Sequence, residues 1–143
     1  MDGGTSDPGA ASHRALRAIR QELERHPAVE SARGLPEGSF VRVIAQFSVD
    51  RPAVGGDATL TVRWFAGSNR ADPPEFSFHY SDGDSDFGWH HEPNPHVDGW
   101  GHVQRREGHE PSYAYRPYEF ASLEPTRVVW EVMEQCLCEL SEG

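Results

Sequence analysis

Lysine is absent from this 143-residue sequence, and all 13 of its basic residues are arginine. The sequence contains 23 acidic residues, which gives a formal net charge of -10 at pH 7. A carboxylate-rich surface without lysine is typical of proteins from salt-loving archaea, where concentrated ions screen the self-repulsion of the chain. A GC-rich genome would also favour arginine over lysine, and the two explanations predict different stabilities at low salt.

The negative charge also bears on the class of partner. Affinity for nucleic acid comes largely from the neutralisation of phosphates, so a net charge of -10 argues against such a partner at ordinary ionic strength. In concentrated salt the argument weakens, because nonspecific attraction is suppressed for every protein and binding depends on local contacts. Nucleic acid therefore stays open as a partner.

Cysteine and long apolar runs are scarce as well. The two cysteines, Cys136 and Cys138, lie two positions apart on an expected helix and so point to different faces, which argues against a disulfide or a two-thiolate metal clip. No run of 18 apolar residues is present, and residues 1–12 lack the basic and apolar regions of a signal peptide. We expect a cytoplasmic protein with no membrane partner.

Apolar periodicity predicts one α+β domain over residues 13–143, preceded by a disordered tail over residues 1–12. Helical spacing marks residues 13–26 and 122–140, while alternation of period two marks strands over residues 39–49, 58–65 and 75–81. A fourth strand is expected through Phe87 and Trp89, and a short extended piece over residues 113–120. The predicted order is an N-terminal helix, a four-stranded antiparallel meander, a long histidine-rich loop and a C-terminal helix packed on the sheet.

Chemistry is concentrated in residues 87–102, which contain four histidines and two tryptophans. Imidazole changes its charge near neutral pH, so such a cluster can transfer protons, bind a metal or contact phosphate. The segment contains His90, His91, His96, His102, Trp89 and Trp100.

In a first interpretation, two of these imidazoles act as general base and general acid in the cleavage of an RNA phosphodiester. Arginine would hold the phosphate, because its planar guanidinium can bind two oxygens at once, and Arg105, Arg106 and Arg116 follow closely in the sequence. Aromatic rings could stack on unpaired bases, and the candidates are Trp89, Trp100, Tyr113 and Tyr115.

Two further interpretations stay open. A metal site could use His90 or His91, His96 and His102, with the carboxylate of Asp98 or Glu92. The spacing matches no strong metal signature, so we expect no metal and no cofactor. Alternatively, the histidines and tryptophans are structural and attach a long loop to the sheet by stacking and hydrogen bonds.

Five short segments together resemble one known family. They are FSFHY at 76–80, FGWHH at 87–91, NPH at 94–96, GH at 101–102 and YEFASL at 118–123. Over residues 40–140 the chain resembles the TumE-like family of toxin–antitoxin proteins. The resemblance implies a small α+β domain that acts as an RNA-cleaving toxin and is neutralised by a DNA-binding antitoxin encoded beside it.

Site residues follow from this resemblance only where the motifs match. Trp89 matches the aromatic residue of the family loop, His96 its first histidine, and His102 the last histidine of its His-x-His pair. The chain departs from the pattern at three positions, where the family's Asp, Asn and first paired histidine are replaced by His90, His91 and Trp100. Either His90 or His91 compensates, or the chain retains the fold and a partner-binding surface without activity.

The leading prediction is a toxin-like, metal-independent endoribonuclease with His96 and His102 as the proton-transfer pair. His90 or His91 would assist, and Arg105, Arg106 or Arg116 would bind phosphate. The alternative is a noncatalytic protein that binds a helix-turn-helix regulator. Across the two interpretations, the expected partners of the protein are RNA and a DNA-binding antitoxin or regulator, and its oligomeric state stays open.

Overall fold

The computed structural model describes residues 8–38, 40–48, 58–69, 71–108 and 110–142. These residues form two helices and seven strands. In chain order they are α1 (Pro8–Arg25), β1 (Val29–Leu35), β2 (Arg42–Phe47), β3 (Thr59–Phe65), β4 (Glu75–Ser81), β5 (Ser85–His91), β6 (Gly101–Glu107), β7 (Ala114–Pro117) and α2 (Pro125–Glu142).

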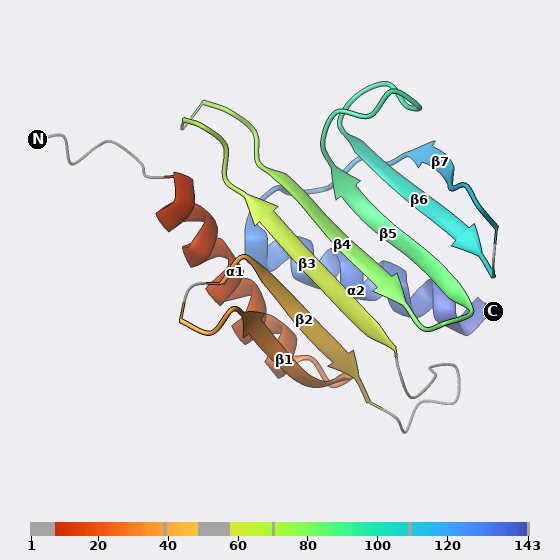
Figure 1. Cartoon of the computed structure of the whole chain (residues 1–143), viewed down its shortest axis with the longest axis horizontal. Coiled ribbons are helices and arrows are strands. Elements are labelled where there is room, and N and C mark those ends of the chain that lie inside the picture. The colour runs from red at the N-terminus through yellow and green to blue at the C-terminus, as the bar shows by residue number, and fades with distance from the viewer. Residues whose placement is uncertain (1–7, 39, 49–57, 70, 109, 143) are drawn as a thin grey trace, which may run out of the picture.

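The seven strands form one antiparallel sheet in which each strand pairs with the next along the chain (Figure 1). The α+β class and the two terminal helices are confirmed, but the prediction of four strands was wrong. It missed β1 and β6 and reduced β7 to an extended piece, because none of the three shows clean apolar alternation. β1 contains an irregularity in its pairing between Val29 and Ser31, and β6 carries polar side chains on one face.

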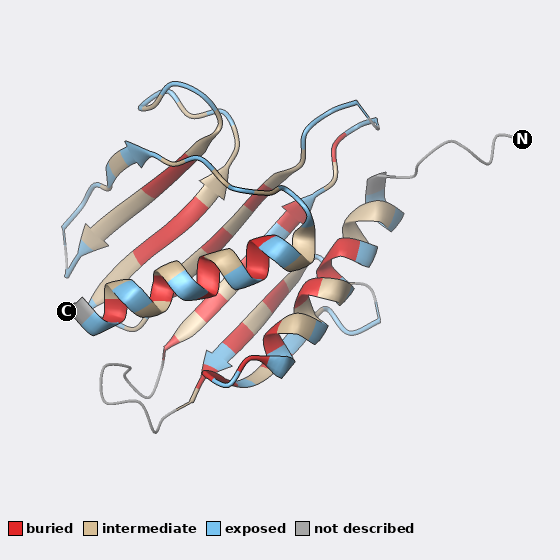
Figure 2. Cartoon of the chain, turned by 180° about the vertical axis from the view of Figure 1, so that it is seen from behind, coloured by how far each residue is buried: buried red, intermediate tan, exposed pale blue. Residues whose placement is uncertain are grey.

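Both helices cover the same face of the sheet, as the view from behind shows (Figure 2). Apolar side chains at alternate strand positions, among them Leu60, Phe78 and Tyr80, point toward the helices and form the core. Helix α2 contributes a buried stripe that includes Val129, Met133 and Cys136, as the helical spacing predicted. We call the opposite side of the sheet, which neither helix covers, the open face (Figure 1).

The long histidine-rich loop is shorter than the sequence suggested. Strand β5 continues through His91, and β6 begins at Gly101, so the connection comprises residues 92–100 only. Three of the four histidines of the segment therefore lie on strands. This correction matters for function, because successive strand residues point to opposite faces of a sheet.

The helix ends also differ from the prediction. Helix α1 begins at Pro8, within the expected tail, whose residues 1–7 lie outside the described part of the chain. Helix α2 begins at Pro125, and the Glu124 carboxylate accepts a hydrogen bond of 2.9 Å from the Arg127 amide in its first turn. Neither of the described helices is long and apolar enough to cross a membrane.

Candidate histidine site on the open face

Three neighbouring strands each place one histidine on the open face. His79 lies on β4, His90 on β5 and His102 on β6, and His90 is directly opposite His102 in the strand register. The His90 and His102 rings are stacked, with their centroids 5.2 Å apart and an interplanar angle of 13°. The His79 and His90 centroids are 5.7 Å apart. Together they form a row of imidazoles across the sheet.

A fourth histidine joins this row from the loop. The exposed His96 ring stacks on Tyr115 of β7, with centroids 4.3 Å apart and planes within 7° of parallel. The Tyr115 ring also lies 6.1 Å from His102. The backbone amide of His96 donates a 2.7 Å hydrogen bond to Asn94 Oδ1, which stabilises the loop conformation that brings His96 over the sheet.

Asp86 of β5 organises the other end of the row. Its carboxylate accepts hydrogen bonds from His79 Nε2, from Arg106 at 2.6 Å and from the Tyr113 hydroxyl at 2.9 Å. Burial would raise the pKa of Asp86, but these hydrogen bonds outweigh it and lower the pKa below its ordinary value. Asp86 is thus an anion that fixes the positions of a histidine, an arginine and a tyrosine.

The middle of the row is buried. His102 has no exposed surface, its Nδ1 donates to the Trp100 carbonyl at 3.2 Å, and Asn94 Nδ2 lies 3.5 Å from its Nε2. Burial, followed by repulsion from His102 and His79, lowers the pKa of His90 to about 3. His90 is therefore neutral at pH 7.

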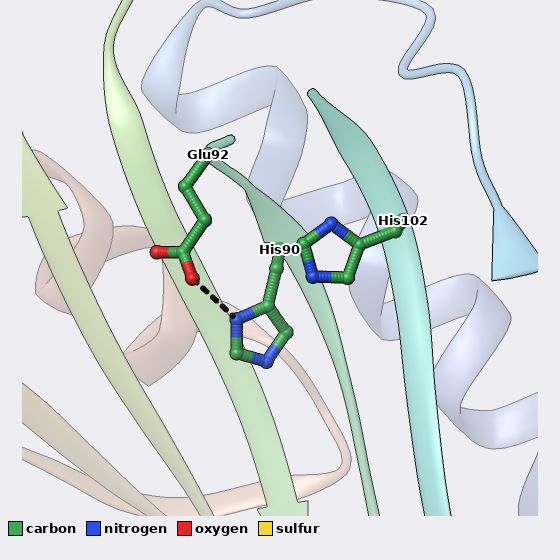
Figure 3. Close-up of side chains that lie close together, drawn as sticks. All are labelled: His90, Glu92 and His102. Atoms are coloured by element: carbon green, nitrogen blue, oxygen red, sulfur yellow. Dashed lines mark ion pairs between the residues drawn. The ribbon is translucent and has the colours of Figure 1, made fainter. Parts of the chain in front are cut away.

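Three of the open-face side chains could hold a metal ion. His90, Glu92 and His102 each offer a ligand atom, and these atoms all lie within 4.8 Å of one another (Figure 3). Glu92 belongs to this group because it follows His90 by two positions and points to the same side of β5. His91, His96 and Asp98, which the sequence left open as ligands, are not members of it.

His91 lies on the opposite side of the sheet from His90. Its ring stacks on Phe76 at a centroid distance of 5.2 Å, and its Nδ1 donates to the Pro74 carbonyl at 2.7 Å. Trp100 lies beside it, with ring centroids 5.3 Å apart. These two residues border a cavity of about 530 Å³ that is also lined by Tyr118, Phe120 and Leu123. They do not join the histidine row.

The three arginines are likewise divided between the two sides of the sheet. Arg106 reaches the open face, whereas Arg105 faces the helices, where it pairs with Glu139 of α2 and lies 4.6 Å from the Phe87 ring centroid. Arg116 is exposed and pairs in the register with Val103, so it points away from His102. Trp89, predicted to contact bases, is 1% exposed and belongs to the core.

The sequence pattern offers Tyr113 for base stacking, but it does not assign His79 or Asp86 to the site. A signal for His79 was present, because it alternates with Phe78 and Tyr80 and so had to point away from the aromatic core. The contact between Asp86 and Tyr113 has no such signal, since the two residues lie 27 positions apart and only the sheet brings them together.

Comparison with known proteins adds no relative. No protein-family model, curated protein or solved structure matches the chain. The residues of the open face are therefore the basis on which a function can be assigned.

Proposed function

We propose that this protein is a toxin-like endoribonuclease of a toxin–antitoxin pair, as the resemblance to the TumE-like family implies, with its active site on the open face. The observation that carries the proposal is the convergence of four imidazoles, from β4, β5, β6 and the loop of residues 92–100, beside Arg106. Four histidines on a face of the sheet that no helix covers could transfer protons to and from a bound RNA strand.

We assign proton transfer to His96 and His79, because a group that exchanges protons with RNA must be accessible to it. His96 is exposed, and the His79 side chain is 23% exposed, whereas His102 is fully buried. One of these imidazoles would take the proton of the 2′-hydroxyl as its oxygen attacks phosphorus, and the leaving oxygen would receive a proton from the other imidazole through intervening water. This assignment replaces the pair of His96 and His102 that the sequence suggested.

Arg106 is the proposed phosphate contact. Its hydrogen bond to Asp86 uses one of the five N–H donors of the guanidinium, and its Cζ lies 4.7 Å from the Tyr113 ring centroid. A planar guanidinium held in this way offers donors to phosphate oxygens. The Tyr113 and Tyr115 rings, 6.4 Å apart on the same side of the sheet, would stack on unpaired bases.

A second candidate function is binding of a regulator without catalysis. The feature that favours it is the cavity on the other side of the sheet, which Trp100, Tyr118 and Phe120 line and where Leu123 is 37% exposed. Aromatic and apolar side chains around a concavity are common at the centres of protein interfaces. In a toxin–antitoxin pair the same surface would receive the antitoxin.

The test is expression in a salt-tolerant host, followed by analysis of total RNA and by cleavage of RNA with purified protein in concentrated KCl. Wild type should arrest growth and fragment RNA, and His96→Ala and His79→Ala should each lower the cleavage rate by about 10²–10⁴-fold. His13→Ala is the matched control, because His13 lies on α1, across the sheet from the site.

Folded wild-type protein that neither arrests growth nor cleaves RNA would overturn the endoribonuclease proposal and favour the regulator-binding candidate. Leu123→Asp provides a separate test of the partner surface. If the cavity receives the antitoxin, this variant should arrest growth even when the neighbouring antitoxin gene is expressed with it.

A further inference from the structure

We propose that His90, Glu92 and His102 bind a divalent transition-metal ion of the zinc class on the open face (Figure 3). The inference goes beyond RNA cleavage, since it rests on the arrangement of three ligands and would hold whatever the substrate is. It also departs from the sequence-based expectation of no metal.

The three side chains meet because of the strand register. His90 and His102 are direct cross-strand partners on β5 and β6, and Glu92 follows His90 by two positions, so all three point to one side of the sheet. Figure 3 shows the Glu92 carboxylate and the His102 ring extending toward the His90 ring. Three candidate metal ligands, two on adjacent strands and one directly after β5, therefore lie close together.

The distances are close to those of a bound site. His90 Nδ1 lies 3.8 Å from Glu92 Oε2, and the candidate ligand atoms of all three residues are within 4.8 Å of each other. Two ligands of a tetrahedral zinc ion are about 3.3 Å apart, given metal–ligand bonds of about 2.0–2.1 Å. The Glu92 side chain is 42% exposed, so its rotation can shorten the distance between its carboxylate and His90 Nδ1.

The burial of the His90 ring nitrogens is a second observation that bears on the site. Both of its ring nitrogens are buried, and neither has a hydrogen-bond partner among the residues that the structure describes. Burying an unsatisfied polar atom is costly, so such atoms are rare in folded proteins and call for an explanation. A metal bonded to Nδ1 would satisfy one of these nitrogens.

His102 has the surroundings of a histidine ligand. Its Nδ1 donates to the Trp100 carbonyl at 3.2 Å, which selects the tautomer that leaves the lone pair on Nε2 available. The Asn94 amide is 3.5 Å from this Nε2, at the limit of a hydrogen bond. An ion could therefore take the Nε2 lone pair at little cost.

The donor set indicates which ions would bind. Two imidazoles and one carboxylate suit zinc and its transition-metal neighbours, whereas calcium and magnesium prefer sites built from oxygen atoms. Three protein ligands leave a fourth position for water or substrate, the pattern of catalytic rather than structural zinc sites. With His90 and His102 as ligands, His79 and His96 remain for proton transfer.

The experiment is a metal titration of the full chain without RNA. Protein stripped with a chelator is titrated with Co²⁺, followed by its visible absorption, and the bound Co²⁺ is then displaced with Zn²⁺. We expect one equivalent to bind and to give the absorption of a four- or five-coordinate site. Glu92→Gln and His90→Gln should each weaken binding by at least about tenfold, since even the loss of an outer-shell partner costs about 10–100-fold.

His91→Ala is the matched control, because it removes the adjacent histidine on the other side of the sheet and should leave metal affinity unchanged. Glu92→Gln alters a side chain that is 42% exposed, so it should fold, and circular dichroism checks each variant. Absence of saturable Co²⁺ and Zn²⁺ binding, or equal binding by wild type, Glu92→Gln and His90→Gln, would overturn the proposal. Since the titration contains no RNA, a failure of the nuclease proposal cannot produce either result.

Discussion

His79 of β4 stands over Gly88, its direct partner on β5, and occupies the space that a side chain at Gly88 would fill. A Cβ atom at this position would clash with His79 Nδ1 and would lie 2.9 Å from the Phe78 carbonyl oxygen. The ring placed in this way donates through Nε2 to Asp86. Glycine at position 88 is thus a condition for the contact between His79 and Asp86.

Gly88→Ala should therefore displace His79 and destabilise the protein. Two of the contacts, with the Phe78 carbonyl oxygen and His79 Cα, are with backbone, so the strands themselves must shift, and overpacking of this kind costs about 1–3 kcal/mol. Denaturant unfolding measures the loss, and NMR of the His79 imidazole reports its separation from Asp86. Ser81→Ala, at the exposed end of β4, is the control and should retain wild-type stability. A Gly88→Ala protein as stable as wild type would contradict this role for Gly88.

Stability should depend on pH through Tyr80 and Asp82. The Tyr80 hydroxyl donates a 2.7 Å hydrogen bond to Asp82. Burial raises the pKa of Asp82, but the hydrogen bond from Tyr80 and two hydrogen bonds from backbone amides outweigh burial, so the pKa is lowered overall. A lowered folded-state pKa means that the stabilisation is fully present above about pH 4, the ordinary pKa of aspartate, and is lost as the pH falls through the folded-state value.

Tyr80→Phe should thus cost about 1.5 kcal/mol at pH 7, the size of a hydrogen bond to a charged group, and less at pH 3. Denaturant unfolding of the two proteins at both pH values provides the comparison. Other carboxylates titrate equally in both proteins and cancel in the difference. If the difference were the same at pH 7 and pH 3, the ionised form of Asp82 would not be the acceptor that matters.

Arg105 and Arg106 should have separable roles, although they are adjacent in sequence. Arg105→Gln removes the ion pair with Glu139 and the contact with Phe87, so it should lower the stability of the packing between the sheet and α2. Arg106→Gln removes a cation from the open face and should weaken RNA binding. Unfolding midpoints and RNA affinity at fixed salt measure the two effects. Equal loss of RNA affinity in both variants would show that the open face is not the binding surface.

Low salt should destabilise the chain because of its net charge of -10. The screening length grows from about 3 Å at 1 M salt to about 30 Å at 0.01 M, so repulsion among surface carboxylates extends over the whole domain as salt is removed. Circular dichroism and thermal unfolding across a KCl series provide the measurement. Stability independent of KCl would instead favour the GC-rich genome as the reason for the missing lysines.

Much of the fold could be predicted because it depends on local periodicity. The alternation in β4 and the helical spacing of Val129, Met133 and Cys136 each predict the buried face of their own element. Strand β6 was not predicted because its open face carries His102, Gln104 and Arg106, which leaves Val103 as its one buried apolar side chain. A strand that lines a polar site loses the pattern by which strands are recognised.

The amino-acid sequence alone predicts that the domain is α+β, that aromatic residues supply its core, and that histidines gather within residues 87–102. Which of these histidines lie together depends on the pairing of the strands. His90 and His91 are separated because neighbours on a strand point to opposite faces, while His90 meets His102 through a register that spans twelve positions of chain. Such a register is set by the pairing of whole strands, so no local pattern around either histidine contains it.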